Sequence, residues 1–152
     1  MGACLLERDK LVPKFCKIIP STLAALDNVL EELMPVVGAM CCAPEHTDDM
    51  ELALGEALAK AIVHGNEGNP NKKVAVACFC ECEADKGLLL VVRDEGPGFD
   101  PDAVPDPTAS ESIYSAHGRG IYLMRQFMDE VEFWSGGREV ELRKRGKPEC
   151  RS

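Results

Sequence analysis

Asp94-Glu95-Gly96-Pro97-Gly98 is an acidic, glycine-containing turn that directly follows an apolar run from Leu88 to Val92. Such a run predicts a buried strand, so Asp94 should emerge where that strand ends. A carboxylate held there can accept a hydrogen bond from an exocyclic amine such as that of adenine. Gly96 and Gly98 permit positive φ and a close backbone approach to a ligand. Taken alone, the Asp-Glu-Gly sequence favours an ordinary acidic turn.

A second glycine pair, Gly118-Arg119-Gly120, follows a long segment without sustained periodicity. That segment, Gly96 to His117, carries prolines at four positions, and a long loop in a compact domain is a candidate lid. The glycine pair opens a helix predicted to run to about Met128. Free N–H groups at a helix N-terminus suit phosphate oxygens, and Arg119 can add charge. The alternative is a helix that merely starts after a glycine turn.

Polar residues at four-residue steps mark a helix predicted from Thr47 to Gly65. Thr47 caps this helix, and acidic residues occupy its first turn, where the helix dipole favours negative charge. Its apolar residues share one face, whereas Glu56, Lys60 and His64 form a stripe on another side. The stripe indicates either a functional carboxylate or a simple i, i+4 pair between Glu56 and Lys60, worth a few tenths of a kcal/mol if exposed.

The rest of the chain predicts strands on either side of these helices. A helix capped at Thr22 should follow the first strand and end at about Pro35. The strands are expected at Lys14–Ile19, Lys73–Glu83, Leu88–Asp94, Val131–Trp134 and Glu139–Arg143. The second and third look like an antiparallel pair. The alternating series Val74, Val76, Cys78, Cys80 and Cys82 is typical of a buried strand face, and this structural interpretation is preferred to metal or redox chemistry.

Composition limits the class of protein. A chain of 152 residues, 45% of them hydrophobic, predicts one domain spanning residues 1–152. The net charge of −9 argues against DNA or RNA as a partner, because nucleic-acid binding relies on clustered Lys and Arg. No secretory signal and no membrane-spanning run is recognised, so a cytoplasmic location with reduced cysteines is expected.

The order and spacing of three segments resemble the GHKL superfamily, the Bergerat-fold ATP-binding proteins. Its first box, Glu-Ala-x-x-Asn-Ala-x-x-His, corresponds to Glu56–His64; its second, Asp-x-Gly-x-Gly, to Asp94–Gly98; and its third, Gly-x-Gly-hydrophobic, to Gly118–Ile121. The likeness covers roughly residues 10 to 145, with an ATP lid at about 96–118. Within the superfamily, the sequence is most similar to the anti-sigma factor serine/threonine kinases.

The resemblance implies a fold and a set of roles. The fold is α+β, a two-layer sandwich in which helices cover one face of a mixed, mostly antiparallel sheet. Asp94 would bind the adenine amine, Gly96 and Gly98 would shape the adenine pocket, and Gly118, Arg119 and Gly120 would lie near the phosphates. Glu56 matches the general base that accepts the proton of a substrate hydroxyl.

One position departs from the pattern. Lys60 stands where the family places the Asn that helps to hold Mg²⁺, and an ammonium has no acceptor with which to ligate a cation. Three outcomes are open: Lys60 replaces part of the metal's charge at the phosphates, Mg²⁺ binds through phosphates and waters alone, or nucleotide binding is weak or lost. An ion pair with Glu56 would also make that carboxylate a poorer base.

Two functions follow from the resemblance. The first is an ATP-binding anti-sigma factor kinase that phosphorylates a STAS-type anti-anti-sigma protein and binds a sigma factor, with a homodimer as the expected assembly. The second, motivated by Lys60, is a catalytically impaired Bergerat-fold module that regulates a partner without phosphoryl transfer. The sequence favours the kinase only slightly. Thiol-based sensing by the cysteine-rich strand is a remote third hypothesis.

Overall fold

The computed structural model describes residues 11–39, 47–81, 87–100 and 116–145. Three longer helices and five strands make up the fold, with a π-helical segment and a short 3-10 turn. In chain order the elements are β1 (Leu11–Pro20), α2 (Leu23–Ala39), α3 (Thr47–Ala59), η2 (Lys60–Gly65), β2 (Lys73–Glu81), β3 (Leu88–Arg93), α4 (Ala116–Phe127), β4 (Glu130–Trp134), η4 (Ser135–Gly137) and β5 (Glu139–Lys144).

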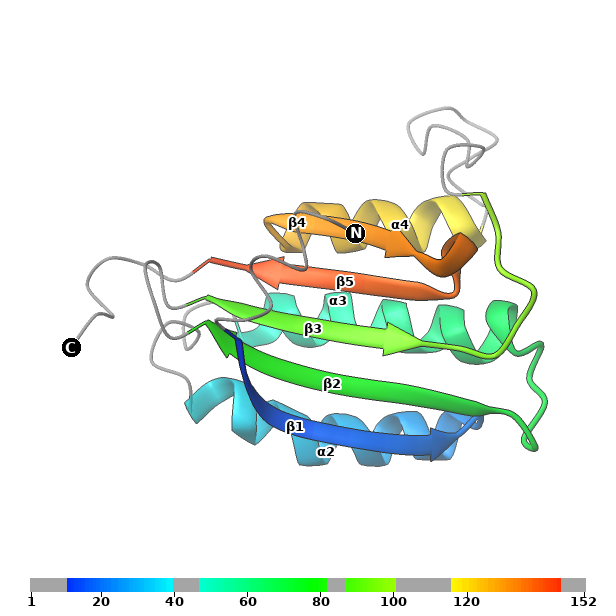
Figure 1. The fold of residues 1–152 in the computed structure, drawn as a ribbon, viewed down its shortest axis with the longest axis horizontal. Coiled ribbons are helices and arrows are strands. Elements are labelled where there is room, and N and C mark those ends of the chain that lie inside the picture. The colour runs from blue at the N-terminus through cyan, green and yellow to red at the C-terminus, as the bar shows by residue number, and fades with distance from the viewer. Residues whose placement is uncertain (1–10, 40–46, 82–86, 101–115, 146–152) are drawn as a thin grey trace.

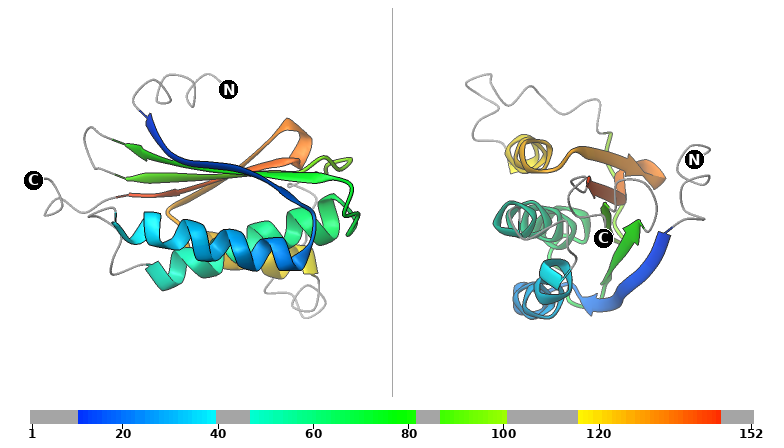
Figure 2. Two further views of the ribbon diagram at one scale, coloured as in Figure 1. Left: turned by 90° about the horizontal axis from the view of Figure 1, so that it is seen from below. Right: turned by 90° about the vertical axis from the view of Figure 1, so that its left-hand side faces the viewer.

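The strands form one sheet in the order β1-β2-β3-β5-β4, and each described pairing is antiparallel. All three longer helices lie against the same face of this sheet, and no helix of the described residues lies on the other face (Figures 1 and 2). The predicted α+β two-layer architecture and the predicted antiparallel pairing of β2 with β3 are therefore confirmed.

Alternation along the strands explains why the sheet has one buried face. In β2, Val74, Val76 and Cys78 are fully buried, and the β3 residues opposite Val76 and Cys78 are the buried Val92 and Leu90. Burial raises the pKa of the Cys78 thiol to about 12, so this thiol stays protonated at neutral pH. The predicted structural role of the cysteine series is confirmed for Cys78, whereas Cys82 lies outside the described residues.

Helix α2 ends later than predicted. It begins after Thr22, whose hydroxyl accepts the Ala25 N–H at 3.1 Å, but it continues past Pro35 to Ala39. Proline removes one donor from a helix interior and disfavours continuation. Val37 is nevertheless fully buried, and packing this apolar side chain against the core offsets the lost hydrogen bond.

The helix predicted from Thr47 to Gly65 begins at Thr47 but changes its winding at Lys60. From Lys60 to Gly65 it is π-helical, and the Asn66 N–H donates to the Ala61 carbonyl at 2.8 Å, one residue further back than in an α-helix. Single π turns occur mostly inside longer helices and often at functional sites. The wider turn changes the winding of the helix at Lys60, which the regular pattern of Glu56, Lys60 and His64 did not predict.

Candidate functional site

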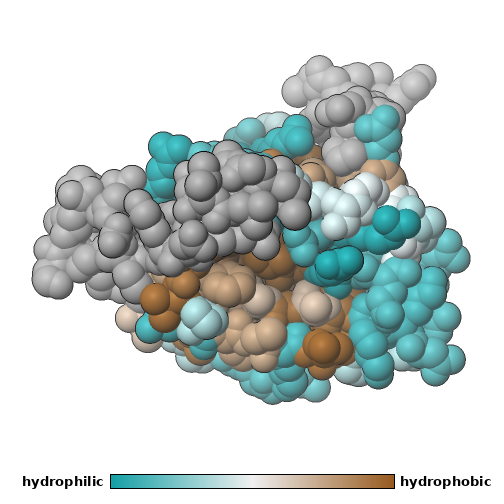
Figure 3. All heavy atoms as spheres, in the orientation of Figure 1, coloured by the Kyte–Doolittle hydropathy of each residue, from teal (hydrophilic) through white to brown (hydrophobic). Residues whose placement is uncertain are grey.

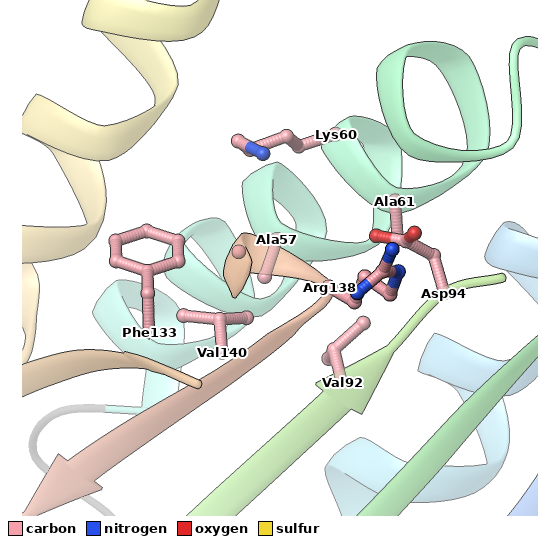
Figure 4. A pocket seen from close by; sticks show the side chains of 9 residues that line it. Ala57, Lys60, Ala61, Val92, Asp94, Phe133, Arg138 and Val140 are labelled. Carbon is pink, nitrogen blue, oxygen red and sulfur yellow. The ribbon is translucent and has the colours of Figure 1, made fainter. Parts of the chain in front are cut away.

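A pocket opens between the α3–η2 helix and the ends of β3 and β5 (Figure 4). The cavity is small, with about 210 Å³ of empty space when its open mouth is included. Nine described residues line it. They are Ala57, Lys60, Ala61, Val92, Asp94, Phe133, Gly137, Arg138 and Val140.

Asp94 is the buried acid of this pocket, with only 7% of its surface exposed. Its backbone N–H donates to the Arg138 carbonyl at 2.9 Å, and its Oδ1 accepts the Gly96 N–H at 2.7 Å. Burial raises the pKa of Asp94, and this effect is opposed by the Gly96 N–H and by the charges of Lys60, Arg138 and Lys72. The site thus holds an oriented hydrogen-bond acceptor beside apolar walls.

Glycines allow the backbone to close around the Asp94 carboxylate. A Cβ on Gly65 would lie 2.5 Å from Asp94 Cγ and 2.8 Å from its Oδ1, far inside ordinary contact. A Cβ on Gly96 would overlap the Gly65 carbonyl. The end of the π-helical segment and the turn after β3 therefore touch one another. Only glycine fits at position 96, where the contact is with backbone, whereas a larger residue at position 65 would displace the Asp94 carboxylate.

Arg138 fixes the turn from Gly96 to Gly98 from the opposite strand. Its Nε donates to the Gly96 carbonyl at 2.7 Å, and its Nη2 donates to the Pro97 carbonyl at 3.2 Å. Its Nη1 donates to the Ser135 carbonyl at 3.0 Å. Sequence reasoning missed this residue, because it follows a glycine turn assigned only to strand connection and carries no motif of its own.

Gly98 has a φ of +82°, a conformation that residues with a side chain rarely adopt. The next residue, Phe99, donates its N–H to the Gly136 carbonyl at 2.8 Å, and a Cβ on Gly137 would lie 2.6 Å from the Phe99 ring. Two glycine turns therefore pack directly on one another. Gly136 and Gly137 are site residues that the sequence identified only as a link between strands.

Lys60 extends over the pocket on the side of Phe133 (Figure 4). Its Nζ lies 3.5 Å from the centre of the Phe99 ring and 5.9 Å from that of Phe133. The two rings meet edge to face, with centroids 5.3 Å apart and planes at 81°. Burial lowers the pKa of Lys60 to about 8, against the opposing charge of Asp94. Between the described groups Glu56 and Lys60 there is no salt bridge, so the simple i, i+4 pair is not formed.

Glu56 instead lies next to the start of α4. A Cβ on Gly120 would be 3.3 Å from Glu56 Oε2, so the Glu56 carboxylate lies close to this glycine. Helix α4 begins at Ala116, two residues before the predicted start, and its first four N–H groups have no partner within the helix. Gly118 and Gly120 thus lie in the first turns of α4. The Arg119 side chain and lid residues 101–115 are outside the described part of the structure.

Asn66 is a second residue that sequence reasoning missed. It is fully buried, its Nδ2 donates to the Lys73 carbonyl at 2.9 Å, and its Oδ1 accepts the Glu95 N–H at 2.8 Å. The Glu95 carboxylate in turn accepts the Lys73 N–H. Asn66 therefore joins the end of η2, the start of β2 and the acidic turn. In the sequence, Asn66 is one polar residue beside a turn-rich segment, and its burial could not be predicted from that position.

The donor set suits an adenine base better than a magnesium ion. Asp94 offers an oriented acceptor between apolar walls, which fits an exocyclic amine on a flat ring. Mg²⁺ needs oxygen ligands, whereas the residue at the expected ligand position is the cation Lys60. Within the described ranges, no group of three His, Cys, Asp or Glu side chains is arranged to hold a metal. Lys60 thus offers no ligand to Mg²⁺ at the position where the family resemblance places one.

Comparisons with known proteins agree with this geometry. The chain matches the histidine kinase-like ATPase domain over residues 19–144. It is 31% identical to an anti-sigma F factor of Bacillus cytotoxicus over 119 residues, which are 77% of this chain and 70% of the relative. It is 30% identical over 116 residues to the anti-sigma F factors of Bacillus thuringiensis and Bacillus anthracis, with 75% of this chain and 68% of each relative covered. None of the described helices is long and apolar enough to cross a membrane. The chain belongs to the histidine kinase-like ATPase (GHKL) family, among relatives that include the anti-sigma F factors.

Proposed function

We infer that this protein is a cytoplasmic, single-domain anti-sigma factor whose partner contacts are controlled by ATP at the Asp94 pocket. The observation that carries this conclusion is the buried, oriented Asp94 carboxylate between glycine contacts in a chain similar to anti-sigma F factors. Asp94 would accept the adenine amine, with Gly96 and Gly98 shaping the pocket edge. Gly118, Arg119 and Gly120 would lie near the phosphates, at the free N–H groups of α4.

The first test measures binding of adenosine, ADP and ATP by calorimetry in the wild type and in Asp94→Ala. Removing a hydrogen bond to a charged group costs about 1.5–3 kcal/mol, which corresponds to a roughly 12- to 150-fold weaker Kd. Asp48→Ala, an exposed acid in the first turn of α3, is the matched control. Equal affinities of the wild type and Asp94→Ala would refute the assignment of the adenine site.

Phosphoryl transfer to a STAS-type anti-anti-sigma protein is the activity we propose for Glu56. The carboxylate lies beside the start of α4, where phosphates are expected, and it is not neutralised by an ion pair with Lys60. It would accept the proton of the attacking Ser or Thr hydroxyl.

The kinase hypothesis predicts ATP-dependent labelling of a STAS-type protein that is first shown to bind. Glu56→Gln should reduce labelling by about 10²- to 10⁴-fold, because it removes the general base. Glu51→Gln, an exposed change elsewhere on α3, should leave the labelling unchanged. A wild-type protein that binds the partner and leaves it unlabelled would exclude the kinase.

The second candidate is a binding module without phosphoryl transfer, and the setting of Lys60 favours it. The ammonium at the expected metal position lies on an aromatic ring and offers no ligand to Mg²⁺. Such a module would bind its sigma factor in a nucleotide-gated or nucleotide-independent manner. Sigma-factor binding that is retained in Glu56→Gln, together with the absence of labelling in the wild type, would support it.

A homodimer is the assembly we propose, and the helix-free face of the sheet supports it. Apolar residues gather on this face over β1, β2 and β3 (Figure 3). Ile18, 67% exposed, lies there opposite Ala75, and Cys16 lies opposite Ala77. Exposed apolar patches commonly mark protein interfaces. Ile18→Glu should convert a dimer to a monomer in light scattering, whereas the exposed Leu23→Glu on α2 should not; a wild-type monomer at high concentration would refute the proposal.

A further inference from the structure

Lys60 places a positive charge in the candidate nucleotide pocket, at the position where the family resemblance places a ligand of Mg²⁺. Lys60 projects its ammonium into the pocket that also contains Asp94, and its nearest aromatic neighbours are Phe99 and Phe133. These rings attract a cation but carry no net charge. The ammonium has no carboxylate within salt-bridge distance in the part of the chain that the structure describes. Its positive charge is therefore available to an incoming anion.

Neither acid of the pocket region forms a salt bridge with Lys60, although the charge of Asp94 acts to raise the pKa of Lys60. Asp94 is oriented by the Gly96 N–H at 2.7 Å and is enclosed by Gly65. Glu56 lies against Gly120 of α4. A divalent cation placed near the Lys60 ammonium would meet a like charge and would gain no protein ligand from it. Three N–H donors on a flexible stem, by contrast, suit phosphate oxygens.

We propose that this site binds adenine nucleotide in its magnesium-free form, with the Lys60 ammonium moving from the Phe99 ring to the phosphates and acting in place of the metal ion. The inference rests on the proposed nucleotide-binding function and deepens it by naming the ionic form of the ligand. Mg²⁺ bound to the nucleotide neutralises part of the negative charge of the phosphates, which attracts Lys60, and is itself a cation that the Lys60 ammonium repels. Mg²⁺ therefore antagonises nucleotide binding to this protein.

The test compares ADP and ATP binding to the whole chain by calorimetry in EDTA and in saturating MgCl₂, with ionic strength kept equal by NaCl. The wild type should bind both nucleotides at least tenfold more tightly in EDTA. Lys60→Asn should reverse this preference, since the amide oxygen can ligate the metal. Lys60→Met should weaken binding in EDTA and lose most of the preference. Adenosine, which has no phosphate, is the matched control ligand and should bind equally in both buffers.

The possible results separate this inference from the function on which it rests. Equal or tighter wild-type binding in MgCl₂ would overturn the magnesium-free inference while leaving nucleotide binding intact. An EDTA preference that persists in Lys60→Met would overturn the role of Lys60. Absence of binding of adenosine, ADP and ATP in both buffers would overturn the proposed nucleotide site itself, and the inference with it.

Discussion

Gly65→Ala should displace the Asp94 carboxylate without disturbing the fold. A Cβ at this position would lie 2.5 Å from Asp94 Cγ, whereas ordinary contacts begin at 3.4 Å, so the carboxylate must retreat by about 0.9 Å. That movement should stretch and weaken the 2.7 Å hydrogen bond from the Gly96 N–H to Asp94 Oδ1. The acceptor proposed for the adenine amine would then lose both its position and its orientation.

The expected magnitudes follow from these contacts. Loss of a hydrogen bond to a charged group costs about 1.5–3 kcal/mol, and alanine in place of a helical glycine returns about 1 kcal/mol. The variant should therefore be about 0.5–2 kcal/mol less stable, which lowers Tm by roughly 1–8 °C in a domain of this size. Adenosine affinity should fall by roughly 12- to 150-fold.

Thermal melts and calorimetric titration with adenosine are the measurements. Gly55→Ala is the matched control, because its Cβ would meet nothing closer than Leu30 Cδ1 at 4.0 Å. This control should raise Tm by about 2–4 °C through helix propensity and leave affinity unchanged. If Gly65→Ala loses stability as expected but binds adenosine as the wild type does, the assignment of Asp94 to adenine is refuted.

Three further perturbations address the same pocket. Asp94→Asn keeps an acceptor for the Gly96 N–H but removes the buried charge. Because burial raises the pKa of Asp94, the stability of the wild type falls as pH rises through that pKa. Asp94→Asn should therefore be more stable than the wild type at pH 7 and should lose this advantage in thermal melts at acid pH. It should also bind adenosine more weakly. Lys60→Met should be more stable than the wild type by about 1–2 kcal/mol below pH 8, after allowance for solvent screening at a half-buried site. The pKa of Lys60 is about 8 in the folded protein and 10.5 in the unfolded chain, so between pH 8 and 10.5 the unfolded chain binds more protons than the folded protein. The stability of the wild type therefore rises with pH in this range. The difference in stability between Lys60→Met and the wild type should shrink in thermal melts from pH 7 to 10. A constant difference would contradict burial of the Lys60 charge. Arg138→Met removes three hydrogen bonds to backbone carbonyls and should lower stability by about 1–3 kcal/mol in urea unfolding, with weaker nucleotide binding, whereas the exposed Arg93→Met should have little effect on either.

Local patterns predicted most of the secondary structure. Apolar alternation identified β2, a continuous apolar run identified β3, and capping at Thr22 and Thr47 gave the starts of α2 and α3, because these signals lie within a few residues of one another. The same local reasoning ended α2 at Pro35, since the buried contacts of Val37 lie outside that window. It also gave no indication that the helix becomes π-helical at Lys60.

The candidate site was also predictable only in part from local sequence. The acidic turn, the helix with Glu56 and the glycine pair before Ile121 were identified from residue type and spacing, and a resemblance joined them into one ATP-binding family. By itself the sequence thus determined the family and the identity of the buried acid, whereas the substitution of Lys60 for a metal ligand stays a prediction.

Only the tertiary structure decided what those residues touch. Arg138 reaches a carbonyl 42 residues away, and Asn66 accepts an N–H 29 residues away, so neither contact leaves a periodic or motif-level trace. The position of the Lys60 ammonium on the Phe99 ring rather than beside Glu56 depends equally on a distant turn held by Gly136 and Gly137. Local sequence fixes which chemical groups are present, whereas long-range packing fixes their partners, because burial and charge are properties of the assembled chain.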